Sequence, residues 1–532
     1  MAVDKRAVEL LNRLNQLETQ RSVWESHWQE LADFISPRKA DITKKRTAGD
    51  KRTELVFDGT AIHAAEMLAA SLHGMLTNPS TPWFSLRFKD RDLEGDDAAK
   101  EWLESVTENM YSAFQSSNFA EAVHELYSDL VVFGTGVMMI EDAEEGLRFA
   151  TRHIGECFLA EDAEGRVDTV YRKFKMTCIA ARNMFGLEAL PTRLQKKAME
   201  EPFTEISLCH AVFPREQYDV TREDGANKPF ASLYIDPEDK KIISEGGFAE
   251  LPYTCPRWLK ASFERGYGRS PGMTALSDTK MLSKMSEVTI RAAQKQVDPP
   301  LMLPDDGFMM PIRTVPGGLN FYRSGTRDRI EPLQIGANNP LGLNMEEQRR
   351  QAIRSAFYVD QLILSQGPQM TATEVIQRTE EKMRLLGPVL GRLQAELLQP
   401  LINRSYSILF RKKAFAPPPE FLAAKEIEIE YVSPLAKAQR FGDVQSAMRL
   451  FEMLAPLAQI DPAVFDHVDM DGLAKYIIRI LGVPAETVLS DEQVAMARRQ
   501  RAQQQQQAAE QQEAVETAEA MGKAAPMVKA VS

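Results

Sequence analysis

The sequence predicts an α+β protein that is mainly helical, and three observations lead to this fold class. Long stretches carry apolar residues at helical spacing, the first of them over residues 4–35. Shorter stretches alternate apolar and polar residues with period two, as in Trp83–Phe88, and predict antiparallel strands. The third pattern, between Arg265 and Tyr358, predicts a helix, an irregular insert and a second helix.

The first helix of this third pattern has clear start and stop signals. Ser270 is a good N-cap, and Pro271 suits the first helical position. The helix is predicted from about Met273 to Val297, because Asp298-Pro299-Pro300 cannot continue it. At ~1.5 Å per residue it is a rod of roughly 37 Å. With the Pro/Gly-rich insert 301–340 and a second helix over 343–358, the pattern predicts a stalk with a knob at its far end.

The stalk helix carries a stripe of charges at steps of three and four residues, which places them on one face. The stripe consists of Lys280, Lys284, Glu287, Arg291 and Lys295. A separate apolar seam is predicted from Leu276, Leu282, Met285, Val288 and Ala292. Two interpretations of the stripe stay open: salt bridges between subunits, or a channel lining in which copies of the helix meet phosphates transiently.

The remaining elements follow from the same periodicities. Further helices are predicted over 58–76, 97–116, 119–133, 178–201, 371–411, 435–457, 471–481 and 491–521. One antiparallel sheet is predicted from strands over 137–140, 147–153, 167–176, 205–213 and 230–235. Another strand is predicted over 427–432. Pro388 and Pro400 lie inside helix 371–411, which should therefore kink or divide. Residues 359–370 contain Gly367-Pro368 and are predicted to form a loop. The basic run 38–52 is predicted to be a mobile loop, either solvated or in contact with nucleic acid or a partner.

Composition limits the function classes. The net charge of −12 and the pI of about 5.4 argue against a protein that coats DNA. They leave room for one that surrounds DNA without gripping it. The four cysteines are far apart and are expected to be reduced and buried, which suits a cytoplasmic site of synthesis. We expect no secretory signal and no membrane span.

Motifs for enzyme chemistry are missing from the sequence. No GxxxxGK[ST] or GxSxG pattern is present, and the seven histidines show no metal-ligand spacing. The glycine-rich stretch Gly266–Gly272 lacks a phosphate-binding lysine and is predicted to be a hinge that leads into a helix. Acidic pairs such as Asp305-Asp306 fit solvated loops better than a metal site. The sequence therefore predicts no catalytic residue, no metal and no cofactor.

Several short strings occur in one order along nearly the whole chain. They are Ile35-Ser36-Pro37-Arg38, Phe57-Asp58-Gly59-Thr60-Ala61, Pro82-Trp83-Phe84, Tyr267-Gly268-Arg269-Ser270-Pro271, Thr371-Ala372-Thr373-Glu374-Val375, Leu386-Gly387-Pro388 and Tyr431-Val432-Ser433-Pro434. Each is weak alone, but together they resemble the head-to-tail connector, or portal, proteins of short-tailed bacteriophages (podoviruses).

The resemblance implies a portal fold, assembled as a ring of usually twelve subunits around a central channel. The implied regions are a wing of N-terminal helices and sheet (1–270), stem helix 1 (271–298), the clip (299–341), stem helix 2 (342–358), a channel loop (359–371), a wing helix with its return strand (372–434), the crown (435–490) and a Gln-rich C-terminal helix or barrel (491–532).

The resemblance also implies a role and partners. Genomic DNA would be packaged by a terminase at one capsid vertex of the virion, retained and later ejected through the same channel. Implied partners are double-stranded DNA, the terminase large subunit, major capsid and scaffolding proteins, tail adaptor and tail tube proteins, and internal core proteins. Candidate DNA-channel residues are Lys280, Lys284, Arg291 and Lys295, and candidate channel-loop residues are Gln361, Ser365, Gln366, Gln369 and Met370.

Two alternatives belong to other classes. One is another ring-shaped virion component, such as a core protein or tail adaptor, which would not need a helix–insert–helix stem flanked by wing segments. The other is a DNA-processing enzyme, against which the missing motor and metal motifs argue.

Overall fold

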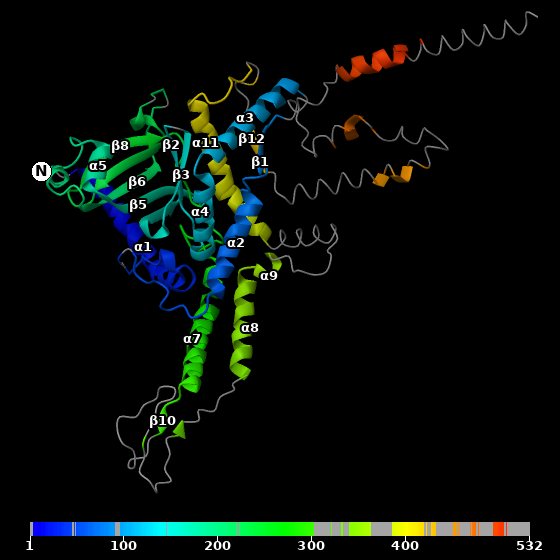
Figure 1. The fold of residues 1–532 in the computed structure, drawn as a ribbon. Helices are drawn as coiled ribbons and strands as arrows, with labels where there is room; N and C mark the ends of the chain where they lie inside the picture. Colours follow the sequence, from blue (N-terminus) through cyan, green and yellow to red (C-terminus); the bar gives the residue numbers. More distant parts are fainter. Residues whose placement is uncertain are drawn as a thin grey trace, which may run out of the picture. The chain divides into compact units, whose positions relative to one another are not determined.

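The computed structural model divides into two compact units, one formed by Met1–Trp83 with Met110–Ala414 and one by Phe84–Asn109 with Phe415–Ser532 (Figure 1). The residues that it describes are 4–44, 47, 49–90, 96–144, 146–219, 221–222, 224–302, 321, 331–332, 340–362, 386–419, 422, 427–431, 449–450, 452–454, 456, 469, 471–474, 477, 493–504 and 507.

A five-stranded antiparallel sheet is the largest β element of the first unit. Its strands follow the chain in the order β4-β5-β6-β7-β8. They are β4 (Cys157–Glu161), β5 (Val167–Thr177), β6 (Glu205–Pro214), β7 (Phe230–Asp236) and β8 (Lys241–Phe248). Helix α1 (Lys5–Ile35) packs on one face, where Leu14 and Leu17 are buried with Tyr171 and Leu233.

The opposite face of this sheet is covered by two short helices, α5 (Cys178–Phe185) and α6 (Thr192–Glu200). Their buried residues pack with Ile206 and Leu208 of β6, whereas Cys209 and Ala211 of the same strand face α1. This alternation follows from the two-residue period of a strand. The sequence predicts one helix over 178–201, and that prediction is wrong between the two helices, because the chain turns at Gly186 (φ +81°) and at Pro191.

A second, three-stranded sheet lies in the same unit, with the order β3-β2-β9. Its strands are β2 (Met138–Ala143), β3 (Gly146–Thr151) and β9 (Tyr253–Thr254). Helix α4 (Phe119–Phe133) contacts it and also packs with α2 (Thr60–Leu76). Gly134 ends α4 in the left-handed region (φ +80°), so the helix ends where the sequence predicts, after Phe133.

The sequence predicts a single sheet, and three of the observed strands, β4, β8 and β9, were not predicted. Strand β4 is a short apolar run without clear alternation, and β8 ends in Gly246-Gly247-Phe248. Gly165 forms the turn between β4 and β5. Two-residue β9 is held to β2 only by tertiary pairing, so no local pattern could reveal it.

Two long helices of the first unit pack side by side in Figure 1: α7 (Pro271–Val297) and α8 (Pro340–Ala356). At the far end of α7, β10 (Leu301–Met302) pairs with β11 (Glu331–Pro332). The short helix α9 (Val359–Leu362) follows α8, where the sequence predicts that a loop has already begun. Tyr358, with φ +58°, separates the two helices, and this backbone turn lets the chain resume a helix in a new direction.

The helix predicted over 371–411 is described from residue 386 onward. A π-helical turn, Gln394–Leu398, precedes α11 (Gln399–Arg411), and Pro400 lies in the first turn of α11. The predicted irregularity at Pro400 is therefore confirmed. Arg404 of α11 is buried and donates to the Ile140 carbonyl (2.9 Å), which ties the helix to the three-stranded sheet.

The second unit contains the two-stranded sheet β1 (Phe84–Phe88) with β12 (Ile427–Tyr431), in which Phe84 pairs with Tyr431. Both strands confirm the sequence predictions. Helix α3 (Asp97–Ser116) contributes Trp102, which stacks on Phe88 and donates from Nε1 to the Ala416 carbonyl (3.0 Å). The described parts of the predicted crown and C-terminal helix, such as 471–474 and 493–504, are helical.

We expect Leu14→Ala to lower the free energy of unfolding by about 2–5 kcal/mol, because the substitution leaves a cavity between α1 and the sheet. Urea denaturation of the purified protein measures it. Val23→Ala on the exposed side of the same helix is the matched control and should change stability by no more than about 0.5 kcal/mol. An equal loss for both variants would contradict the packing described for α1.

A second prediction concerns His210 of β6, whose ring nitrogens contact the Tyr253 hydroxyl (3.1 Å) and Ser232 Oγ (2.9 Å). Burial lowers the pKa of His210 from 6.5 to about 3, so the fold holds a neutral ring while the unfolded chain binds a proton. Stability from this residue is complete above pH 6.5 and is lost as the pH falls toward 3.

His210→Gln should therefore weaken the acid-side decline of the urea midpoint, measured on both sides of pH 6.5. His63→Gln, at an exposed histidine on α2, is the control and should leave the decline unchanged. An unaltered decline in His210→Gln would show that other groups cause it.

Candidate channel helix and its supporting contacts

The first turn of α7 is fixed to the end of α4. Ser270 Oγ accepts a hydrogen bond from the Met273 amide (2.9 Å) and donates one to the Val132 carbonyl (2.7 Å). A side chain at Gly272 would place its Cβ 2.9 Å from the same carbonyl oxygen. The predicted N-cap at Ser270 is confirmed, and the cap also docks the helix on its neighbour.

The segment before this cap is packed rather than open. The amides and carbonyls of Leu259 and Arg269 pair with each other (2.7 and 3.2 Å), and Gly268 donates to Thr135 Oγ1 (2.8 Å). Burial raises the pKa of Tyr267, whose hydroxyl accepts from the Leu159 amide (3.2 Å). The glycines of 266–272 therefore serve close backbone packing in this structure.

The contact between α7 and α8 is largely polar. Buried α7 residues at helical spacing include Thr279, Ser283 and Ser286. Thr289 Oγ1 donates to Glu346 Oε1 (2.6 Å), and Arg349 pairs with Asp278 (2.8 Å).

The apolar seam predicted for α7 is correct only for its first half. Leu276 and Leu282 are buried, whereas Val288 is 57% exposed and Ala292 is exposed. The difference arises because hydroxyl-bearing residues occupy the face that meets the neighbouring elements. Periodicity alone cannot tell which of two faces a helix buries.

The short segment Leu55–Asp58, called the strap below, contacts both helices. Ser283 Oγ donates to the Leu55 carbonyl (2.7 Å) and accepts from the Phe57 amide (3.2 Å). Asp58 pairs with Arg350 of α8 (3.0 Å). Burial alone would raise the pKa of Asp58, but hydrogen bonds from Thr60 and the charge of Arg350 lower it. Sequence reasoning missed this role, since the strap lies far from both helices along the chain.

The predicted charge stripe is present, and most of its cations have partners within the chain. Lys280 pairs with Glu30 of α1 (3.0 Å). Lys284 and Arg291 share Glu287 at 2.9 and 2.6 Å, and the hydrogen bond from Lys284 lowers the pKa of Glu287. Lys295 is exposed in the last turn, with no carboxylate of the described residues in ion-pair contact. These surface pairs add little stability but orient the side chains.

Of the five predicted channel-loop residues, the structure describes one. Gln361 lies in α9, so the backbone there is helical. Ser365, Gln366, Gln369 and Met370 lie outside the described residues.

The basic run 38–52, expected to be a mobile loop, is held by ion pairs where it is described. Lys39 contacts Asp129 (2.6 Å) and Glu125 (2.9 Å) of α4. Burial alone would lower the pKa of Lys39, but these two carboxylates raise it. Arg52 pairs with Asp41 (2.6 Å). Lys39 is therefore held by acidic residues of α4, which local composition does not reveal, whereas Arg52 pairs within the run itself.

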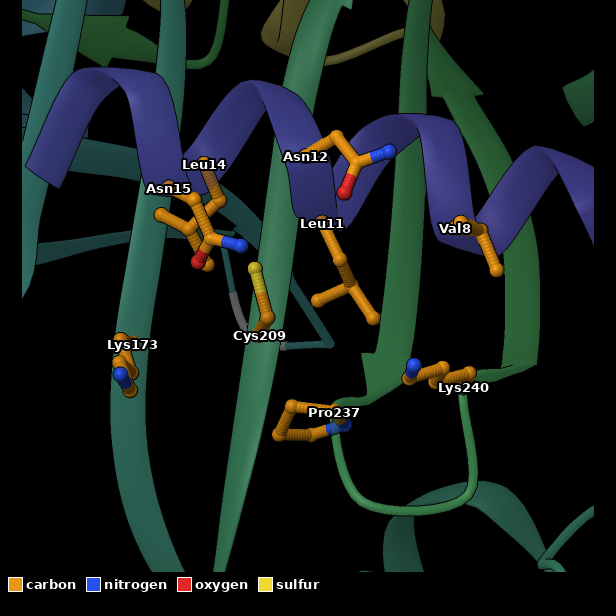
Figure 2. Close-up of a pocket in the computed structure, with 9 residues that line it drawn as sticks. All are labelled: Val8, Leu11, Asn12, Leu14, Asn15, Lys173, Cys209, Pro237 and Lys240. Carbon is orange, nitrogen blue, oxygen red and sulfur yellow. The ribbon is translucent and has the colours of Figure 1, made fainter.

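A small cavity of about 170 Å³ lies between α1 and the five-stranded sheet. Figure 2 shows Leu11 and Val8 projecting from α1 above Pro237 and Lys240, with Cys209 projecting from its strand. Burial raises the pKa of Cys209 to about 12, so the thiol stays protonated. All four cysteines are free and buried, which confirms the expectation from the sequence.

Within the part of the chain that the structure describes, no cluster of His, Cys, Asp and Glu side chains has an arrangement that could hold a metal ion. Among the same residues, no helix combines the length and apolar character needed to cross a membrane.

Comparison with known proteins identifies the family. The family described as bacteriophage head to tail connecting protein matches residues 7–489. The probable portal protein of Bordetella phage BPP-1 is 35% identical over 512 residues, covering 93% of this chain and 91% of the relative. The portal protein of Salmonella phage epsilon15 is 33% identical, with the same coverage. The chain therefore belongs to the bacteriophage head-to-tail connecting protein family. Its function is that of a phage portal, and its location is the virion.

Two solved structures also match. A chain in the virion of a native gene transfer agent particle has 13% identity and a TM-score of 0.34, over 74% of this chain and 85% of its own. A chain in the neck of an empty gene transfer agent particle has 11% identity and a TM-score of 0.37, over 75% and 89%. At these scores the likeness adds nothing to the sequence similarity.

The polar seam between α7 and α8 gives a prediction. Thr289→Val should leave Glu346 without the threonine donor, and amide exchange in α7 and α8 should be about fivefold faster. Hydrogen-exchange mass spectrometry on the purified protein measures the rates. Thr289→Ser keeps the hydroxyl and should exchange at the wild-type rate. Equal acceleration in both variants would mean that the threonine methyl, not the hydrogen bond, holds the pair.

Proposed function

We propose that copies of this chain form a dodecameric ring around a central channel at one capsid vertex, and that double-stranded DNA passes through this channel. Membership of the head-to-tail connecting family supports the proposal. The observation within the chain that carries the proposal is the exposure of the C-terminal part of α7, residues 288–297.

Every residue of α7 from 288 to 297 is exposed, and several of them are apolar. Val288, Ile290 and Val297 have exposed fractions of 57%, 44% and 87%. Several exposed apolar side chains on one stretch of helix favour an interaction surface. In a ring, the same helix of a neighbouring copy covers them, because each subunit presents the same pair of surfaces to the next.

The regions follow from this arrangement. Helices α7 and α8 form the stem, with the clip at 299–341 and the channel loop at 359–371. Residues 1–270 and 372–434 form the wing, 435–490 the crown, and 491–532 a C-terminal helix or barrel. The α7–α8 pairing and the β10–β11 contact at the far end of α7 support the stem and clip assignments.

DNA contact in this channel is weak and transient. The net charge of −12 repels phosphates over most of the surface, so the duplex does not stick. Of the stripe, Lys280, Lys284 and Arg291 are engaged by carboxylates. Lys295 is the cation best placed to meet a phosphate. Gln361 at the end of α9, with Gln366 and Gln369 after it, offers uncharged contacts.

The remaining partners follow from the same role. The clip receives the terminase large subunit during packaging and the tail adaptor and tail tube proteins afterwards. The wing and crown meet major capsid, scaffolding and internal core proteins. The chain acts as a passive conduit, not as an enzyme, and the terminase supplies the energy.

Native mass spectrometry with negative-stain imaging tests the ring. Twelve copies of 59.8 kDa give a species of about 718 kDa, seen as a ring with a central hole. A monomer or dimer under conditions that favour assembly would contradict the proposal.

Charge reversal tests the channel assignment. Lys295→Glu should leave ring assembly unchanged and reduce the amount of DNA packaged per particle severalfold, because it replaces a phosphate-attracting ring by a repelling one. Lys196→Glu on α6 makes the same charge change at an exposed site outside the stem. Packaging assays on assembled particles compare them. Wild-type packaging by Lys295→Glu particles would remove Lys295 from the channel assignment.

A further inference from the structure

The π-helical turn at Gln394–Leu398 has a local cause. In an α-helix the ring of Pro400 would clash with the carbonyl of Glu396, four residues earlier, and Pro400 has no amide to donate. The chain is helical on both sides, from residue 386 to 393 and through α11. The wider turn absorbs the conflict without ending the helix.

Glu396 lies in the middle of this turn and makes the most contacts to another segment. Its carboxylate accepts from the Arg257 amide (2.9 Å), Arg257 Nε (3.0 Å) and Arg257 Nη2 (2.7 Å). Arg392, one turn earlier, also reaches it (3.1 Å). The guanidinium and the main chain of one residue are therefore held together by one carboxylate.

Arg257 has little freedom to move elsewhere. It is 2% exposed and also contacts Glu161 and the Gly165 carbonyl (3.0 Å). Glu161 in turn accepts from Lys260 (2.9 Å). A buried guanidinium that lost Glu396 would keep only one carboxylate, which is strongly unfavourable in a low-dielectric site.

Arg257 belongs to the segment that carries the start of α7. Arg257 forms an antiparallel β-bridge with Thr135, and the Trp258 amide donates to the Gly134 carbonyl (2.9 Å). A Cβ built on Gly268 would lie 2.9 Å from the Arg257 Cβ and 2.6 Å from the Gly134 oxygen. With so little space, a shift of Arg257 must move Gly268, two residues before the Ser270 cap.

The helix register decides whether Glu396 can reach Arg257. The apolar residues Leu393, Leu397 and Leu401 are fully buried and anchor the observed register. One residue corresponds to about 100° of rotation in an α-helix. If the turn became α-helical, Glu396 would rotate by about that angle relative to α11 and leave Arg257.

We propose that the π turn and the Glu396–Arg257 ion pair form a register latch that sets the position of the first turn of α7. In the latched register Glu396 holds Arg257, and Arg257 holds the Gly268–Ser270 segment against α4. Pro400 keeps the turn in this register, so a variant without Pro400 should lose the contact and loosen the start of α7. The latch itself does not depend on the portal function, although its effect on a DNA channel rests on the role proposed for α7.

Hydrogen-exchange mass spectrometry on the full-length protein tests the latch, with peptides that cover 266–276 and 386–398 as reporters. The variants are Glu396→Gln, Pro400→Ala and the double variant. Glu250→Gln is the matched control, because it removes a carboxylate that pairs with Arg404 and Arg411 of α11 without touching the π turn.

Exchange in 266–276 should rise about tenfold in Glu396→Gln, from loss of the charged contact. Pro400→Ala, which removes the cause of the π turn, should raise it similarly although Pro400 belongs to another element. The double variant should exchange no faster than the faster single variant, because both changes break one contact. Glu250→Gln should leave 266–276 unchanged.

Wild-type exchange of 266–276 in Pro400→Ala would overturn the latch and make Glu396–Arg257 a static ion pair. Wild-type exchange there in Glu396→Gln would overturn it as well. Additive effects in the double variant would show two independent perturbations and no shared register.

Discussion

The double hydrogen bond of Ser270 is the contact on which the candidate channel helix depends. One hydroxyl caps α7 and at the same time docks it on the Val132 carbonyl at the end of α4. Because a long helix amplifies small rotations at its base, this contact helps to set where the far end of α7 lies. The packed segment before Ser270 and the close approach of Gly272 to α4 hold the first turn in the same place.

Several polar contacts join the elements around this helix. Thr289 with Glu346, Asp278 with Arg349, and the Leu55–Asp58 strap hold α7 to α8. Apolar packing is concentrated instead between α1, the five-stranded sheet and α5–α6. The exposed apolar residues at the end of α7 are therefore the surface that the proposed ring would cover with a neighbouring copy.

Much of the fold could be predicted from the sequence where a signal is local. Ser270-Pro271 and Asp298-Pro299 define the ends of α7, and Gly134 ends α4, because caps and breakers act within one turn of the chain. The sequence predicts β1 and β12 as two separate strands. Only the tertiary structure shows that they pair, and in which register. The division into two sheets and the strands β4, β8 and β9 escaped prediction, since short strands exist only through their neighbours.

For the candidate site, the sequence by itself determined which residues share a helix face and that the chain resembles phage portal proteins, a family that the comparisons then confirmed. Only the tertiary structure decided which cations are engaged. Lys280 meets Glu30 from 250 positions away, and Lys39 meets Asp129 across 90. Glu396, in the π-helical turn, meets Arg257 across 139 positions. Helical spacing follows from local backbone geometry, whereas ion pairing depends on which distant segments fold together.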